Sequence, residues 1–135
     1  MSRTRFLHPP GWARPKGYSN GVAARGLLVF TGGVVGWDAQ ETFTATDFAG
    51  QFAQVLDNIL AILAEAGAGP EHVVRMTWYV LSREEYVAAL PEVGRAYRER
   101  MGRNFPAMAV VEVSALMEAA ARLEIEATAV VPDTA

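Results

Sequence analysis

The chain has 135 residues, of which 51% are hydrophobic and 20% are charged, a composition typical of one folded globular domain. It contains no cysteine, which excludes a disulfide framework, a thiolate metal site and a cysteine nucleophile. Its formal net charge of −3 argues against a nucleic-acid partner. Because no apolar run has the length of a signal peptide or a membrane span, we expect a cytoplasmic protein that does not bind membranes.

Basic residues are concentrated near the N-terminus. No Asp or Glu precedes Asp38, whereas five basic residues do: Arg3, Arg5, Arg14, Lys16 and Arg25. This stretch suits either an RNA- or phosphate-facing surface or a solvated arm. The second interpretation is simpler, because no RNA-binding pattern of interleaved aromatic residues accompanies the charges. With three prolines in it, residues 1–16 are expected to form an irregular arm before a single domain over residues 17–135.

Short strands are predicted at the start of that domain. Residues 22–24 and 27–31 have strand composition and are separated by Arg25-Gly26, a turn signal. Gly32 and Gly33 then interrupt the second strand, and residues 34–37 are expected to form another short one.

The clearest predicted helix spans residues 48–66. Its apolar side chains follow the three-and-four spacing of one helical face: Phe48, Phe52, Val55, Ile59, Ile62, Leu63 and Ala66. Such a face is typical of a helix that packs on a sheet. Asp47 is the predicted N-cap, and Gly67 is the predicted stop.

A buried strand is predicted over residues 73–81, which are rich in β-branched and aromatic side chains. Alternation places two sets of residues on opposite faces: Val74, Met76, Trp78 and Val80 on one, and Arg75, Thr77 and Tyr79 on the other. After this strand, Ser82 and Glu85 have the spacing of a helix-capping box.

The helix that Ser82 opens cannot continue unchanged through Pro91, which lacks an N–H and clashes with the preceding turn. We therefore expect one helix to about residue 90 and a second over residues 91–101, stopped by Gly102. Strands over residues 107–113 and 123–131 complete the order β-β-α-β-α-β-β. This order predicts an α+β fold of two layers, a mixed sheet with helices on one face.

The last two strands carry a more specific signal. The first opens with Phe105-Pro106-Ala107-Met108 and the second contains Glu124-Ile125-Glu126-Ala127. Together they resemble the signature of the Rid family, the reactive-intermediate imine/enamine deaminases, which are also known as YjgF or L-PSP endoribonuclease proteins. The resemblance extends from Gly17 to Val131. It implies a chorismate-mutase-like fold and a homotrimer, whose sheets form a central barrel with small-molecule clefts between subunits.

The resemblance also implies functional residues. Glu126 matches the glutamate thought to position the attacking water, and we predict it as the catalytic residue. Met108 stands where the family has an arginine that binds the substrate carboxylate. A thioether cannot replace that charge, and losing one partner of such a pair costs about 2–5 kcal/mol. Two other cations, Arg75 and Arg103, are candidates for its replacement, with a structural or surface role preferred for Arg75.

Further residues match the family's binding positions. Predicted substrate-binding residues are Tyr18, Gly32, Tyr86, Met108 and Ala109. Gly33 and Pro91 stand where many members have glutamine and asparagine. The sequence has no glycine-rich phosphate loop and no metal-ligand spacing, so no cofactor or metal is expected.

Three functions are compatible with these observations. The first is hydrolysis of a small imine or enamine that lacks an amino-acid carboxylate, by a divergent relative of the 2-iminobutanoate/2-iminopropanoate deaminases. The second is a non-catalytic ligand-binding or regulatory trimer that kept the cleft. The third is an L-PSP-type endoribonuclease, which the net charge and the absence of a paired His–His or His–Lys arrangement disfavour.

Overall fold

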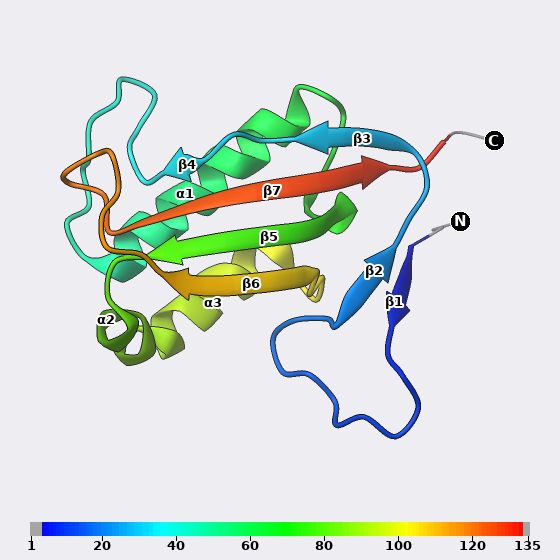
Figure 1. The fold of residues 1–135 in the computed structure, drawn as a ribbon. Coiled ribbons are helices and arrows are strands. Elements are labelled where there is room, and N and C mark those ends of the chain that lie inside the picture. Colours follow the sequence, from blue (N-terminus) through cyan, green and yellow to red (C-terminus); the bar gives the residue numbers. More distant parts are fainter. Residues whose placement is uncertain (1–3, 134–135) are drawn as a thin grey trace.

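The computed structural model describes residues 4–133 and shows helices packed on one side of a mixed sheet (Figure 1). The strands are β1 Arg5–Leu7, β2 Gly21–Ala23, β3 Leu27–Phe30, β4 Val34–Val35, β5 Val73–Val80, β6 Ala107–Glu112 and β7 Leu123–Val131. The helices are α1 Phe48–Ala64, α2 Arg83–Ala88 and α3 Leu90–Met101, with a short 3₁₀ helix, η1, at Pro70–His72. The predicted two-layer α+β fold is confirmed.

The main sheet has five strands in the order β3-β7-β5-β6, with β4 also paired to β7. Only β5 and β6 are parallel, and the other pairs are antiparallel. β7 and β5 therefore lie inside the sheet. Side chains that face away from the helices on these two strands come together at the centre of an open surface.

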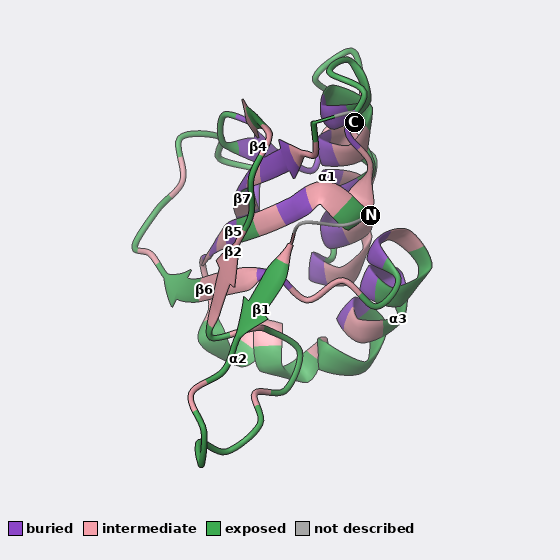
Figure 2. Cartoon of the chain, turned by 90° about the vertical axis from the view of Figure 1, so that its right-hand side faces the viewer, coloured by how far each residue is buried: buried purple, intermediate pink, exposed green. Residues whose placement is uncertain are grey.

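The core lies between this sheet and the helices. Helix α1 begins at the predicted N-cap, where the Asp47 carboxylate accepts a hydrogen bond from the Gly50 amide. Its buried face includes Phe52, Leu56 and Ile59, which are fully inaccessible to solvent. Buried residues of α1 and β7 meet where helix and sheet pack together (Figure 2). Burial of this apolar face is the main reason that the 17-residue helix is stable.

Two side-chain amides, of buried Gln51 and half-buried Asn104, fix the loops around this core. The Gln51 side chain, only 1% exposed, donates to the carbonyls of Ala45 and Ala120 and accepts from the Arg122 amide. It thereby joins α1 to the segment that leads into β7. Asn104 similarly donates to two carbonyls next to the start of β5. Buried polar groups need such partners, because an unsatisfied one costs free energy.

The break between the last two helices is also as predicted. Ser82 caps α2 by accepting from the Glu85 amide. Pro91 lies in the first turn of α3, where its missing N–H costs no helical hydrogen bond. Gly102 follows α3 with φ of +61°, a backbone conformation that favours glycine.

The N-terminal region differs from the prediction. Residues 1–16 were expected to be irregular, but residues 5–7 form β1, which pairs with β2 in a separate two-stranded sheet. The first predicted strand therefore does not join the main sheet. Three-residue strands carry too short a pattern to be identified from sequence. Residues 1–3 of the arm lie outside the described residues.

A bulge corrects the predicted faces of β5. Alternation holds from Arg75 to Val80, but the register with β7 shifts between Val73 and Arg75. As a result Val73 is in the buried core, whereas Val74 is only half-buried. An extra residue of this kind reverses the faces on one side of it. Within residues 4–133, no helix has both the length and the apolar character needed to cross a membrane.

Candidate functional site

A pocket of about 430 Å³ lies on the open face of the sheet. It is lined by Phe30, Thr31, Arg75, Thr77, Tyr79, Ala109, Glu126, Ala127 and Thr128. We call it the Glu126 pocket. These residues come from β3, β5, β6 and β7 and from the residue after β3, so the sheet itself forms the floor.

The register of the strands brings these side chains together. Thr77 of β5 is paired with Glu126 of β7 and with Ala109 of β6. Successive residues of a strand alternate between faces, and the neighbours Ile125 and Ala127 are buried on the helix side. Glu126 is therefore directed to the open face, where its side chain is exposed.

Tyr79 is the direct partner of Glu126. Its hydroxyl donates a hydrogen bond to Glu126 Oε1. This bond raises the pKa of Tyr79 above its ordinary value, and loss of water contact and the negative charges of Glu126 and Glu124 add to the rise. Arg75 has a smaller, opposing effect on the same pKa. The carboxylate thus has one oxygen fixed by a protonated phenol.

A second depression, of about 270 Å³, also includes Tyr79 and Glu126, together with Gly33 and Glu124. The hydrogen-bonded pair therefore borders two hollows. Gly33 leaves room for the Glu124 carboxylate, since a Cβ at position 33 would lie 2.0 Å from Glu124 Oε2. A larger residue at position 33 would displace the flexible Glu124 side chain from this depression.

Thr31 fixes the wall of the Glu126 pocket beside β7. Its backbone N–H donates to the Ala127 carbonyl, and its hydroxyl accepts from the Ala127 amide at 3.0 Å. The same hydroxyl donates to the Gly32 carbonyl. Thr31 is one of the few buried polar residues. Its hydrogen bonds hold the end of β3 next to Glu126.

The predicted site residues are only partly brought together within one chain. Ala109 lines the Glu126 pocket. Gly32 lies beside it in the link to β4, with no atom within 4 Å of where a Cβ would be. Tyr18 lines a different cavity, near the start of β6.

Tyr86 and Met108 lie on the helix side of the sheet. The Tyr86 ring packs 5.9 Å from Phe48 and 6.2 Å from Trp78, measured between ring centres, and burial raises its pKa. Met108 is paired with buried Met76 and packs against the core. A single chain does not bring these two side chains to Glu126, and their substrate-binding roles stay predictions.

The two candidate cations are separated. Arg75 lines the Glu126 pocket, whereas Arg103 lines the cavity that contains Tyr18. Arg75 is exposed and makes no ion pair with any residue between 4 and 133. No group of three side chains in this part of the chain is arranged to hold a metal ion.

Sequence reasoning did not assign a role to Tyr79 or Thr77. The signal was present in the alternation of β5, which placed both with Arg75 on one face. What was missing was the register between β5 and β7, because a cross-strand hydrogen bond depends on which residues lie opposite each other.

The amino-acid sequence matches one described protein family and several of its relatives. Residues 12–131 match the family described as Endoribonuclease L-PSP. A RutC family protein of Haemophilus influenzae is 34% identical over 78% of this chain and 80% of its own length. A 2-iminobutanoate/2-iminopropanoate deaminase of Salmonella typhimurium is 31% identical, with the same coverage of each chain.

Solved structures agree with the sequence matches. The crystal structure of YyfB from Yersinia pestis, a protein of the conserved Rid family, superposes with a TM-score of 0.83. The two sequences are 30% identical, and the match covers 96% of this chain and 99% of the other. The similarity therefore includes the sheet, the helices and the strands that carry the Glu126 pocket.

Proposed function

Because the chain belongs to the YjgF/L-PSP/Rid family, we propose that it hydrolyses a small imine or enamine in the Glu126 pocket. The observation that carries this proposal is a carboxylate at the centre of the open sheet face, fixed by Tyr79 within a pocket of small-molecule size. One relative is named as an imine deaminase. Family membership alone does not specify a reaction, so the argument depends on this pocket.

In the proposed reaction, water attacks the carbon of the C=N bond. Glu126 orients the water and accepts its proton through the carboxylate oxygen that Tyr79 does not occupy. The proton then passes to the nitrogen, which gives a carbinolamine. Glu126 next transfers the proton of the carbinolamine hydroxyl to the same nitrogen, the C–N bond breaks, and the products are a carbonyl compound and ammonia. General acid–base assistance of this kind contributes roughly 10²–10⁴-fold to a rate, which suits an imine that already hydrolyses in water.

The proposed substrate lacks an amino-acid carboxylate. Met108 supplies no charge, and its side chain packs toward the core rather than into the Glu126 pocket. Arg75 is the one arginine that lines this pocket, but it is solvated, and its long side chain would have to be ordered to bind a carboxylate. The rest of the pocket lining suits a small uncharged substrate. It offers the hydroxyls of Thr77 and Thr128 and the apolar surfaces of Phe30 and Ala109.

We also propose that the site is completed in a homotrimer. Large apolar residues are exposed on the strands at the open face: Leu28, Phe30 and Val111. An apolar surface of this kind marks an interaction site more often than it faces water. A second copy of the chain on this face would cover the apolar side chains and enclose the Glu126 pocket. Sedimentation equilibrium tests this, since a monomer would leave the pocket open.

The reaction is tested by ammonia release from an imine generated in situ by an oxidase, compared with the rate in buffer alone. An acceleration that disappears in Glu126→Gln supports the proposal. Equal rates with and without the protein, over several neutral and anionic imines, would instead indicate a ligand-binding protein without hydrolase activity.

A further inference from the structure

The chain opposite Glu126 contains one more residue than a regular strand pair. β3 pairs with β7 as far as Phe30, and β4 resumes the pairing with β7 at Val34. Between these points, residues 31–33 lie opposite only two residues of β7, Glu126 and Ala127. An extra residue on one side of an antiparallel pair is a β-bulge, which bends its strand and changes the direction of nearby side chains. We call residues 31–33 the glycine bulge.

Thr31 attaches the start of the glycine bulge to Ala127. In a regular antiparallel pair, two opposite residues exchange two backbone hydrogen bonds. Thr31 makes one of these with its backbone, from its N–H to the Ala127 carbonyl at 2.9 Å. The other, from the Ala127 N–H, goes to the Thr31 hydroxyl oxygen at 3.0 Å. A side-chain oxygen thus replaces the backbone carbonyl, which leaves the main chain free to turn away from β7.

The same hydroxyl also holds the next residue of the bulge. It donates to the Gly32 carbonyl at 2.8 Å, so its one proton is already used. Thr31 is only 9% exposed, and a buried polar group that loses its partner destabilises the fold. Because the hydroxyl has no second proton to donate to a substrate, we infer that it serves the Glu126 pocket through the strands.

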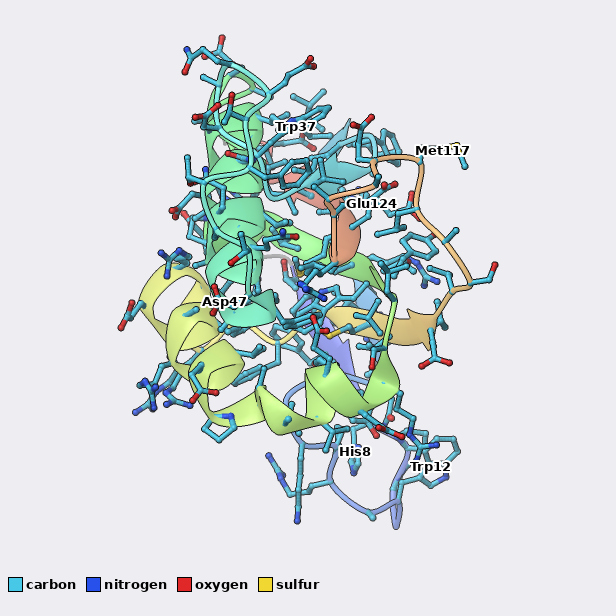
Figure 3. The ribbon with its side chains drawn as sticks, turned by 90° about the vertical axis from the view of Figure 1, so that its left-hand side faces the viewer. His8, Trp12, Trp37, Asp47, Met117 and Glu124 are labelled. Carbon is cyan, nitrogen blue, oxygen red and sulfur yellow. The ribbon has the colours of Figure 1, made fainter. Side chains whose placement is uncertain are left out.

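The second glycine of the bulge lies beside a carboxylate of β7. A Cβ at position 33 would lie 2.0 Å from Glu124 Oε2, whereas a Cβ at position 32 would meet no atom within 4 Å. Glu124 lies on the side of the sheet away from α1 (Figure 3), the side to which Glu126 is also directed. The path of the bulge therefore affects the space that is open to the carboxylates on this face.

From this geometry we propose that Thr31 is a positioning residue for Glu126. Its hydroxyl holds the glycine bulge open, and the bulge sets the direction in which β7 presents the carboxylate to Tyr79 and to the attacking water. Ala127 directly follows Glu126, so a shift of its backbone moves the carboxylate too. Without the hydroxyl, the Thr31 carbonyl would have to accept from Ala127, as in a regular pair, and this would close the bulge. The role toward water rests on the proposed hydrolysis, whereas the role toward Tyr79 does not.

Thr31→Val tests the proposal, because it replaces the hydroxyl with a methyl group of similar size. We expect kcat for imine hydrolysis to fall about 10- to 100-fold with KM nearly unchanged, since misplacing a catalytic group by about 1 Å has an effect of this scale. Thr31→Ser keeps the hydroxyl and should keep most of the rate. Thr44→Val, the same substitution at an exposed position before α1, is the matched control and should leave the kinetics unchanged.

The titration of Tyr79 is a readout that a loss of stability alone would not change. The hydrogen bond to Glu126 is the main reason that the pKa of Tyr79 is raised. In Thr31→Val this pKa should therefore fall toward its ordinary value, whereas in Thr31→Ser and Thr44→Val it should stay raised. Deletion of Gly32 removes the extra residue but keeps the hydroxyl, and it should lower the pKa of Tyr79 in the same way.

These measurements separate the positioning role from the hydrolase activity. If the wild type does not accelerate imine hydrolysis but both variants lower the pKa of Tyr79, the positioning role stands and the hydrolase proposal fails. If the wild type is a hydrolase and Thr31→Val keeps its kcat and the raised pKa of Tyr79, Thr31 does not position Glu126. A change in KM alone, with the same pKa, would overturn the proposal too. Should Thr31→Val not fold, an unchanged pKa of Tyr79 in the Gly32 deletion would overturn it.

Discussion

Tyr79 and Glu126 lie on neighbouring antiparallel strands, and the phenol donates a hydrogen bond to the carboxylate on the face of the sheet that the helices leave open. The pair borders both hollows of this face. Since a carboxylate with one oxygen fixed has fewer orientations, the other oxygen is better placed to align a water molecule.

Tyr79→Phe is expected to lower kcat for imine hydrolysis about tenfold while leaving KM nearly unchanged. The substitution removes only the hydroxyl, so Glu126 remains but is less well oriented, and the loss is smaller than the roughly 10²–10⁴-fold of acid–base catalysis. Steady-state kinetics measures this split. A change in KM alone would show that Tyr79 contacts the substrate rather than the carboxylate.

The titration of Tyr79 gives a second, independent check. Ionisation would place a phenolate beside Glu126 and Glu124, so its pKa is raised above the ordinary value of 10.0. The absorbance difference between the wild type and Tyr79→Phe isolates this residue from the other tyrosines. In Glu126→Gln the pKa of Tyr79 should fall toward its ordinary value, whereas an unchanged titration would contradict the hydrogen bond.

The charge of the substrate is tested by comparing a neutral imine with 2-iminobutanoate. We expect the neutral imine to be hydrolysed faster than 2-iminobutanoate, because neither Met108 nor a solvated Arg75 provides a strong carboxylate partner. For the same reason, Arg75→Gln should hydrolyse each compound at a rate similar to that of the wild type. If 2-iminobutanoate is the better substrate and Arg75→Gln removes that preference, Arg75 has replaced the family's arginine.

The buried amide of Gln51 should matter for stability and not for the reaction itself. Gln51→Leu leaves two carbonyls and one amide without partners, and each unsatisfied buried group costs about 1–3 kcal/mol. We expect urea denaturation to show a loss of at least about 2 kcal/mol. Gln40→Leu, at an exposed position, is the control and should change the stability little.

The parts of the fold that were predicted correctly have local causes. Asp47 caps a helix because its side chain reaches an amide three residues later, and Pro91 separates two helices because it lacks an N–H. The alternating faces of β5 from Arg75 to Val80 follow from a period of two. None of these signals requires knowledge of a distant segment.

The features that were missed depend on long-range register. β1 pairs with β2 across a loop of thirteen residues, from His8 to Asn20, and three residues carry no usable pattern. Met108 faces the core because β6 pairs in parallel with β5, opposite Met76. The contact between Tyr79 and Glu126 likewise joins residues far apart in sequence.

Glu126→Gln tests the central claim most directly, with Glu124→Gln as the matched control on the same strand and face. Ammonia release should fall about 10²–10⁴-fold, to the rate in buffer, only in the Glu126 variant, with circular dichroism and oligomeric state unchanged in both. Hydrolysis by Glu126→Gln at the wild-type rate would contradict the assignment of this carboxylate as the catalytic group.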